Sequence, residues 1–190
     1  ILAEKATTEK VAFMVRHTTG ILCVAMTQDR ARHLRLPLMV EENQDSKKTA
    51  FTVSVDYKVG LTTGVSATER ANTARALADK GAAHSDFIRP GHVFPLIADK
   101  GGLRARRGHT EAGVALAQLV GAAPLTLLSE IVAEDGSMAR GQTLLDFATQ
   151  HSIPMVSIQE LVDIAPVAQE VRSDYEFVWA NLPLHSGMWK

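Results

Sequence analysis

The sequence contains one cysteine and almost no net charge. Cys23 has no second cysteine to pair with, so an intrachain disulfide is impossible and the reducing cytoplasm is the expected location. Lysine and arginine total 20 and aspartate and glutamate total 21, which gives a formal net charge of -1. This balance argues against a nucleic-acid-binding protein or a polybasic membrane-surface protein. A small anionic ligand stays compatible with it, because such a ligand needs only a local cluster of cations.

Long apolar runs are missing as well. Charged residues interrupt every hydrophobic segment well before the roughly 20 residues that a membrane-spanning helix needs, so no membrane partner is expected. The first residues show no charged leader followed by an apolar core and a cleavage site. What the chain does contain is 190 residues of which 46% are hydrophobic, enough for a sizeable core in one compact domain.

Segments with helical and strand periodicity alternate along the chain. The pattern predicts helices over 8–19, 28–34, 67–80, 110–120, 143–151 and 158–163, and strands over 21–25, 51–56, 93–98, 125–132 and 155–157, with 1–3 as the tail of another strand. This order favours an α/β sandwich with a mixed, largely buried sheet flanked by helices. The alternation is lost from about Pro166, so 165–190 is expected to be a C-terminal arm or a linker.

Residues 104–111 place three arginines and a glycine immediately before a predicted helix. Free backbone N–H groups and the positive end of the helix dipole favour an anion there, and Gly108 permits close approach. Arg106 or Arg107 can fork onto phosphate oxygens, and the Thr110 hydroxyl adds a donor. The alternative is a solvated basic turn in which Thr110 merely caps the helix. The local pattern does not decide between the two.

Two histidines are candidates for chemistry. His109 lies at this helix start, where positive charge disfavours its protonation and leaves a neutral imidazole for a metal ion. Taken alone, it is more typical of a capping or supporting histidine. His92 follows a Pro-Gly turn before an apolar strand, and an imidazole titrates near neutrality as general acid–base chemistry requires. A histidine bonded to its own turn is the alternative, and the local sequence favours it.

Glu130 is the unusual carboxylate of the chain. Strand periodicity places it on the same face as Leu128 and Val132, where a charge is costly unless it is paired, ligand-bound or protonated. The alternative is a face open to water at a strand end. Cys23, in contrast, lies in an apolar segment and is more typical of inert packing than of a nucleophile.

Several motifs occur in order along the chain: RHTTG (16–20), LPLM (36–39), TAFTVSVD (49–56), TTGVSA (62–67), RPGHVFPL (89–96), GHTEA (108–112) and DGSMAR (135–140). Together they resemble the 3,4-dihydroxy-2-butanone 4-phosphate synthase family of riboflavin biosynthesis, almost continuously over 1–164. The resemblance implies a three-layer α/β sandwich and a homodimer with active sites at the subunit interface. It also implies a lyase that converts ribulose 5-phosphate into 3,4-dihydroxy-2-butanone 4-phosphate and formate with Mg2+ or Mn2+.

The resemblance assigns roles to individual residues. His109 matches a metal-binding histidine, and the segment from Arg106 through Arg107, Gly108 and His109 to Thr110 matches the site for the substrate phosphate. His92 matches a catalytic histidine. Glu130 matches an essential carboxylate that also contacts the substrate.

Departures from the family leave an alternative open. The family's N-terminal acidic loop, which supplies further metal and substrate ligands, precedes the region to which Ile1 corresponds. A sequence without that loop is expected to bind metal weakly, and the alternative function is a non-catalytic dimerising scaffold or a truncated remnant of a bifunctional riboflavin biosynthesis protein. Residues 182–190 faintly resemble the start of a GTP cyclohydrolase II domain, the usual fusion partner.

Overall fold

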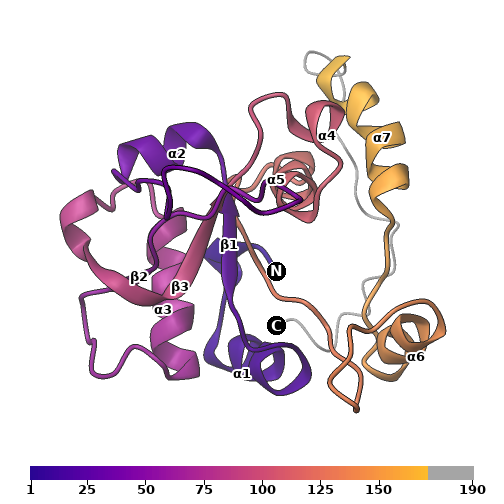
Figure 1. Cartoon of the computed structure of the whole chain (residues 1–190), viewed down its shortest axis with the longest axis horizontal. Coiled ribbons are helices and arrows are strands. Elements are labelled where there is room, and N and C mark those ends of the chain that lie inside the picture. Colours follow the sequence, from indigo (N-terminus) through magenta and orange to yellow (C-terminus); the bar gives the residue numbers. More distant parts are fainter. Residues whose placement is uncertain (171–190) are drawn as a thin grey trace.

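The computed structural model describes residues 1–170, and helices and strands alternate through most of that range (Figure 1). The elements are η1 (Ala3–Lys5), α1 (Thr8–His17), β1 (Cys23–Met26), α2 (Gln28–His33), β2 (Val55–Tyr57), α3 (Ala67–Ala78), η2 (His84–Asp86), β3 (Phe87–Ile97), α4 (Gly102–Ala105), α5 (His109–Leu119), β4 (Thr126–Leu128), α6 (Gln142–Gln150) and α7 (Ile158–Glu170). The predicted α/β class is confirmed.

The strands form one mixed sheet in the order β2-β3-β1-β4. β1 and β3 are parallel, whereas β2 lies antiparallel to β3 and β4 lies antiparallel to β1. Cys23 of β1 pairs with Phe94 on one side and with Leu128 on the other. This register determines which residues meet at each end of the sheet.

Alternate residues of the central strand β1 face opposite helical layers. Val24 and Met26 belong to the larger core, which also contains buried residues of α1, α2 and α3. Ala25 belongs to a second cluster with Val114 of α5. Every residue of β1 is buried, as expected for a strand covered on both faces. The sheet is therefore the middle layer of three.

The helix starts follow the capping chemistry of the sequence. Thr7 and Thr27 each accept a backbone N–H from the third residue after them, and Ser66 forms a reciprocal capping box with Glu69. Helix α5 begins at His109, one residue before the predicted start, and its N-cap is Gly108 with no side-chain cap, so the alternative of a Thr110 cap is not found. Thr110 lies inside the first turn and does not cap the helix.

Several strand predictions were wrong in extent. β4 ends at Leu128, because the backbone of the next residues turns toward the segment after α1. No strand forms over 155–157, where Met155 and Val156 are exposed and have no neighbouring strand to pair with. Residues 1–3 make a single bridge, Leu2 to Thr126, before η1 begins. At 155–157 the apolar pattern was present but a pairing partner was not, whereas residues 1–3 do bond to 125–127 before η1 begins.

Strand β3 begins earlier than predicted. The segment Arg89–His92 was expected to end a loop, yet it lies inside β3, whose first half pairs with β2. Helix α7 runs to Glu170, beyond the predicted end at Asp163, so the first residues of the expected arm are helical. The rest of that arm lies outside the described residues.

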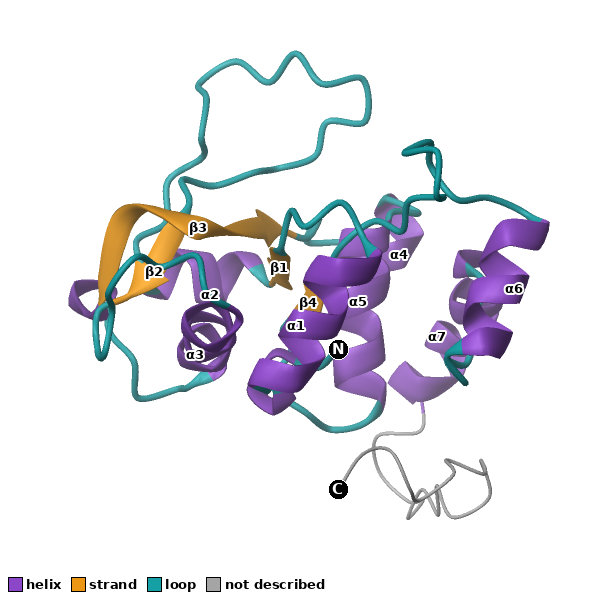
Figure 2. Cartoon of the chain, turned by 90° about the horizontal axis from the view of Figure 1, so that it is seen from below, coloured by secondary structure: helices purple, strands orange, loops and turns teal. Residues whose placement is uncertain are grey.

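Helices α6 and α7 lie at the end of the molecule away from β2 (Figure 2). Helix α7 packs on α4 and α5. Its Leu161 is buried in one cluster with Leu103 of α4 and Ala112 of α5. Helix α6 contacts α1 through the rings of Phe147 and Phe13. Over 1–170 no helix is long and apolar enough to cross a membrane.

Gly113 tests how closely α5 packs on the sheet. A Cβ at this position would lie 2.1 Å from the Thr126 hydroxyl oxygen and 3.6 Å from the Ala25 Cβ. Gly to Ala inside a helix normally stabilises by up to about 1 kcal/mol. Here we expect Gly113→Ala to lower the free energy of unfolding by about 1 to 3 kcal/mol, because the helix must move off the sheet.

Urea unfolding of G113A, T126A and the double variant measures this effect. T126A removes the clashing oxygen, so the double variant should recover most of the stability lost by G113A alone. Equal destabilisation by G113A in both backgrounds would contradict the contact.

Candidate functional site

Asp56 of β2 and His92 of β3 form a hydrogen-bonded polar pair. The His92 Nδ1 lies 2.7 Å from one carboxylate oxygen of Asp56, and the His92 backbone N–H donates to the other oxygen at 2.9 Å. The Asp56 side chain is only 5% exposed, whereas that of His92 is 47% exposed. A buried carboxylate thus fixes an imidazole that reaches solvent. Its Nε2 has no hydrogen bond within 1–170 and is available for proton exchange.

Glycines allow the backbone to form this pair. A Cβ on Gly91 would lie 2.1 Å from the Val55 carbonyl carbon and 2.3 Å from the Asp56 nitrogen, so only glycine lets β3 lie this close to β2. The pairing register also shifts between Val55 and Asp56. Gly64, at φ +79, would place a Cβ 2.1 Å from Asp56 Oδ2 and 2.6 Å from His92 Nδ1. The loop before α3 therefore packs directly over the pair.

Glu69 holds that loop in place. Its carboxylate accepts from the Thr62 backbone N–H at 2.6 Å, the Thr62 hydroxyl at 2.8 Å and the Ser66 hydroxyl at 2.6 Å. The Ser66 backbone N–H adds a bond at 3.2 Å. The Ser66 hydroxyl, followed by the Thr62 groups, holds the pKa of Glu69 far below its usual range. Glu69 is therefore an ionised anchor at neutral pH for the loop that covers Asp56 and His92.

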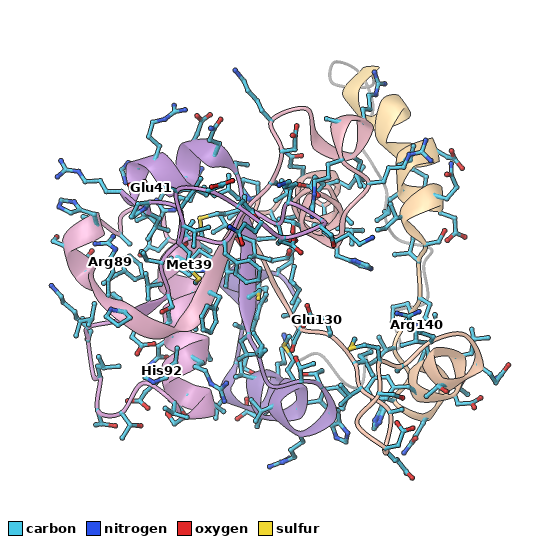
Figure 3. The ribbon with its side chains drawn as sticks, viewed as in Figure 1. Met39, Glu41, Arg89, His92, Glu130 and Arg140 are labelled. Carbon is cyan, nitrogen blue, oxygen red and sulfur yellow. The ribbon has the colours of Figure 1, made fainter. Side chains whose placement is uncertain are left out.

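Glu130 lies on the other side of β1 at the same end of the sheet. By extension of the strand register, Ile21 lies level with His92 on one side and with Glu130 on the other. Figure 3 shows His92 and Glu130 on opposite sides of β1. The Thr19 hydroxyl lies 3.4 Å from Glu130 Oε2, and the Thr19 backbone N–H donates to the Glu130 carbonyl at 2.9 Å.

The predicted apolar surroundings of Glu130 are not found. Because β4 stops at Leu128, Glu130 lies beyond the strand and its side chain is exposed. Its negative charge still acts on Cys23, which is buried in β1. Burial raises the pKa of the Cys23 thiol to about 12, and Glu130 adds to that shift. Cys23 is thus a packing residue, as the sequence indicated.

A second polar cluster surrounds the start of α5. The Arg106 guanidinium donates to Glu111 at 2.6 Å, to the Lys47 carbonyl at 3.1 Å and to the Thr49 hydroxyl at 3.3 Å. The Glu111 side chain is 1% exposed. A Cβ on Gly108 would lie 2.3 Å from Arg106 and 2.6 Å from Glu111, so this glycine makes room for the ion pair.

The other predicted residues of this segment lie apart from one another. Arg107 donates to Gln159 of α7 at 3.0 Å and is exposed. His109 is exposed in the first turn of α5, and Thr110 is buried. With Gly108 as an uncapped N-cap, the first N–H groups of α5 remain available to a ligand. The arginine predicted to fork onto phosphate, Arg106, instead ties Glu111 to the loop that contains Lys47.

The two clusters lie at opposite ends of the central strands. The Asp99 backbone N–H donates to Glu111 at 2.8 Å, which places the start of α5 just beyond the end of β3. His92 lies five residues before Ile97, or about 16 Å along the strand. One chain therefore does not bring His92 and Glu130 into a common cavity with Arg106 and His109.

Metal ligands are also not gathered within one chain. Among residues 1–170, no group of three or more His, Cys, Asp or Glu side chains is placed to hold a metal ion. A cleft of about 640 Å3 lies elsewhere, lined by Glu4, Arg75, Ala78, Asp79, Lys80 and Gly121–Pro124. None of those residues was predicted to be functional.

Sequence reasoning missed Asp56 and Glu69. Asp56 appeared only as the last residue of the TAFTVSVD motif, and Glu69 lay in the predicted helix over 67–80 without an assigned role. The available signal was the motifs, because Asp56 is the last residue of TAFTVSVD and the glycines of TTGVSA and RPGHVFPL both pack against it. Glycines at the required positions, rather than the acids themselves, mark the close packing.

Comparisons with known proteins agree with the motifs. Residues 1–164 match the family model described as 3,4-dihydroxy-2-butanone 4-phosphate synthase. The chain is 48% identical over 161 residues to the 3,4-dihydroxy-2-butanone 4-phosphate synthase of Proteus mirabilis, covering 85% of this chain and 74% of that protein. It is 48% identical over 162 residues to the riboflavin biosynthesis protein RibBA of Chlamydia muridarum, again over 85% of this chain but 38% of that relative's length.

Solved structures agree as well. A 3,4-dihydroxy-2-butanone 4-phosphate synthase in complex with two magnesium ions superposes with a TM-score of 0.82 and 46% identity, covering 89% of this chain and 83% of that one. A two-domain synthase from A. baumannii, RibBX, gives a TM-score of 0.81 at 40% identity, covering 85% of this chain and 48% of that one.

The Glu69 anchor predicts a pH-dependent contribution to stability. Because its folded pKa is depressed, the stabilisation is fully present above the ordinary carboxylate pKa of about 4.3 and is lost as pH falls below it. We expect Glu69→Gln to unfold at a lower temperature than wild type at pH 7. The difference should shrink below about pH 4. A constant difference between pH 7 and pH 3 in calorimetric melts would contradict this role.

Cys23 should resist alkylation. With a pKa of about 12 and a buried side chain, almost no thiolate is present at pH 8. Mass spectrometry after iodoacetamide treatment should show no adduct on the native protein and one adduct after denaturation. Rapid native labelling would show that the thiol is exposed and ionised.

Proposed function

The chain belongs to the 3,4-dihydroxy-2-butanone 4-phosphate synthase family, and we propose that it converts ribulose 5-phosphate into 3,4-dihydroxy-2-butanone 4-phosphate and formate in riboflavin biosynthesis. The observation that carries this proposal is the Asp56–His92 pair, in which a buried carboxylate holds a solvent-reaching imidazole within a chain that matches the family over 1–164. The chain spans only 38% of the length of a relative such as the RibBA protein of Chlamydia muridarum. The activity is therefore proposed for the described domain and not for a longer protein.

His92 would exchange the proton on a carbon next to the ketose carbonyl. Its Nδ1 faces Asp56 at 2.7 Å, so the neutral ring carries its proton on that nitrogen and presents Nε2 as the base. Asp56 also favours the imidazolium that forms when the proton is taken. Glu130, exposed at the same end of the sheet, is proposed to contact substrate hydroxyls and to take part in later proton transfers.

The substrate phosphate is proposed to bind at the start of α5, on residues 106–110. Uncapped N–H groups of the first turn and the helix dipole favour an anion there. Gly108 and Thr110 form part of this turn. Beside it, Arg107 offers an exposed cationic donor and His109 an exposed imidazole. Arg106 supports the same turn through Glu111, and its role at the phosphate is part of this proposal.

A divalent cation, Mg2+ or Mn2+, is proposed as cofactor because the solved relative at 46% identity holds two magnesium ions. His109 offers one ligand. No set of three candidate ligands forms within 1–170, so these residues do not by themselves complete a metal site. No catalytic step is therefore assigned to the ion.

A homodimer is proposed because the residues of the site are not gathered within one subunit. The two clusters lie at opposite ends of one chain, and a second copy can bring the α5 start of one subunit to the His92 end of the other. Leu38, Met39 and Val40 form an exposed apolar run, and Ile88 is 41% exposed, which suits an interface.

A cytoplasmic location and a fused GTP cyclohydrolase II domain are also proposed. A relative from Oryza sativa is described as a probable bifunctional riboflavin biosynthesis protein, and residues 182–190 of this chain lie outside the described range.

Formate release from ribulose 5-phosphate tests the proposed activity. With Mg2+ present, the wild-type protein should release formate, and His92→Ala should lose about 100-fold or more in kcat. Asp56→Asn, which leaves the ring without its negative partner, should lose a comparable factor. Chelation by EDTA should stop turnover, and added Mg2+ should restore it.

His33→Ala is the matched control, because His33 is exposed on α2 and has no part in the pair. It should retain wild-type turnover. Absence of formate from the folded wild-type protein would overturn the activity and favour the non-catalytic scaffold. Full activity of H92A would overturn the role of His92 alone.

A further inference from the structure

A phenylalanine followed four residues later by a histidine occurs both in α1 and at the end of α6. The pairs are Phe13 with His17 and Phe147 with His151. Residues four apart lie on the same face of a helix, and the ring centroids are 4.5 Å apart in both pairs. Each helix therefore presents an imidazole beside a phenyl ring.

The two histidines face each other across the contact between α1 and α6. The ring centroids of His17 and His151 are 4.8 Å apart, and the Phe13 ring lies 5.0 Å from that of His151. No residue of α6 is buried, and the rings of Phe147 and His151 join this helix to α1. The four rings thus form one cluster that holds α6 in place.

Ring packing does not explain why two of the four rings are imidazoles. Within 1–170, neither His17 nor His151 has a side-chain hydrogen bond or an ion pair. Both side chains are partly exposed, so small ions in solution can reach the cluster. Phenylalanine would supply the same packing at both positions, and the ring nitrogens are the groups left without a partner.

The separation of the two imidazoles matches that of two ligands on one metal ion. A metal lies about 2.0 to 2.1 Å from a histidine nitrogen, and hence about 3.2 Å from the ring centroid. Two such rings at an angle of about 100° to 110° on the ion have centroids about 5 Å apart. The ion also lies in the plane of each ring. Planes tilted by 56°, as these are, can share such a point, whereas parallel stacked rings cannot.

We propose that His17 and His151 form a binding site for a transition-metal ion of the Zn2+, Ni2+ or Cu2+ class, which joins α6 to α1. Imidazole nitrogens suit these ions, whereas Mg2+ prefers oxygen ligands. With two protein ligands, the remaining positions on the ion are open to water or to a further ligand. The site goes beyond the proposed activity, because neither histidine is among the residues proposed to bind substrate or Mg2+.

An ion at this site holds both ends of the segment between β4 and α6. His17 precedes Thr18, whose hydroxyl lies 2.8 Å from the Ser129 hydroxyl, and Thr19, whose backbone N–H donates to the Glu130 carbonyl. Residues 129–141 run from this turn to the start of α6. Fastening α6 to α1 therefore limits how far the two ends of the segment can move apart.

Calorimetric titration of the full chain with Zn2+, in the presence of excess Mg2+, tests the site. His17→Phe and His151→Phe keep a ring in the cluster but remove its nitrogens. His33→Phe is the matched control, because His33 is exposed on α2 and belongs to neither pair. All variants are made in a His109→Gln background, so that the imidazole proposed for the Mg2+ site does not contribute.

We expect the His109→Gln chain to bind one Zn2+ ion that requires both histidines. Its affinity should fall about 100-fold or more in H17F and equally in H151F, because either imidazole alone lacks the second ligand. H33F should bind like its parent. Zn2+ in excess should also raise the melting temperature of the parent and of H33F but not that of H17F or H151F.

Unchanged Zn2+ affinity in both H17F and H151F overturns the proposal and leaves an aromatic packing cluster. Loss of binding in only one of the two also overturns it, because the ion would then be held by a single histidine. The phenylalanine variants should melt like their parent when no Zn2+ is present, which separates loss of the ion from loss of the fold. None of these measurements depends on formate release.

Discussion

The hydrogen bond between Asp56 and His92 is the interaction on which the rest of the site depends. It crosses from β2 to β3 and requires a register shift after Val55. It also requires glycine at 64 and 91, where any side chain would meet the pair or the strand beside it. Asp56 is buried and His92 reaches solvent. Such a pair offers little surface for binding a substrate, but it is well suited to moving a proton. The local fold is arranged to leave one imidazole nitrogen free.

The electrostatics around this pair follow the same arrangement. Glu69 is saturated with hydrogen bonds, and so it stabilises the covering loop without competing for the His92 proton. Arg70, the next residue, is buried and donates to the Gly20 carbonyl, while its Nε has no acceptor among the described residues. Two adjacent residues of α3 thus bond to different segments, Glu69 to the loop before the helix and Arg70 to the turn before β1. The start of α3 supports the site without touching the substrate.

Much of this architecture was predictable from the sequence, and the failures have physical causes. Helix starts at Thr7, Thr27 and Ser66 were predicted, because capping is local chemistry. Strand ends were not, because a strand needs a partner that periodicity does not reveal, as 155–157 shows. His92 was expected at the end of a turn, whereas the pairing of β3 with β2 extends the strand through it.

The candidate site was predictable in part. His92, Glu130 and the start of α5 were found from residue type and local pattern, whereas Asp56 and Arg70 depend on contacts between segments distant in sequence. The residues that the resemblance assigned do not lie together in a single chain, because His92 and the start of α5 lie toward opposite ends of β3. No sequence pattern within one chain reveals what a second copy brings.

Exchange of substrate protons with solvent tests the central claim most directly. In deuterium oxide, NMR of ribulose 5-phosphate incubated with the wild-type protein should show deuterium entering the carbon next to the ketose carbonyl. The same incubation with H92A should show almost none. Exchange at the wild-type rate in H92A would contradict the account, because some group other than the Asp56–His92 pair would then remove the proton.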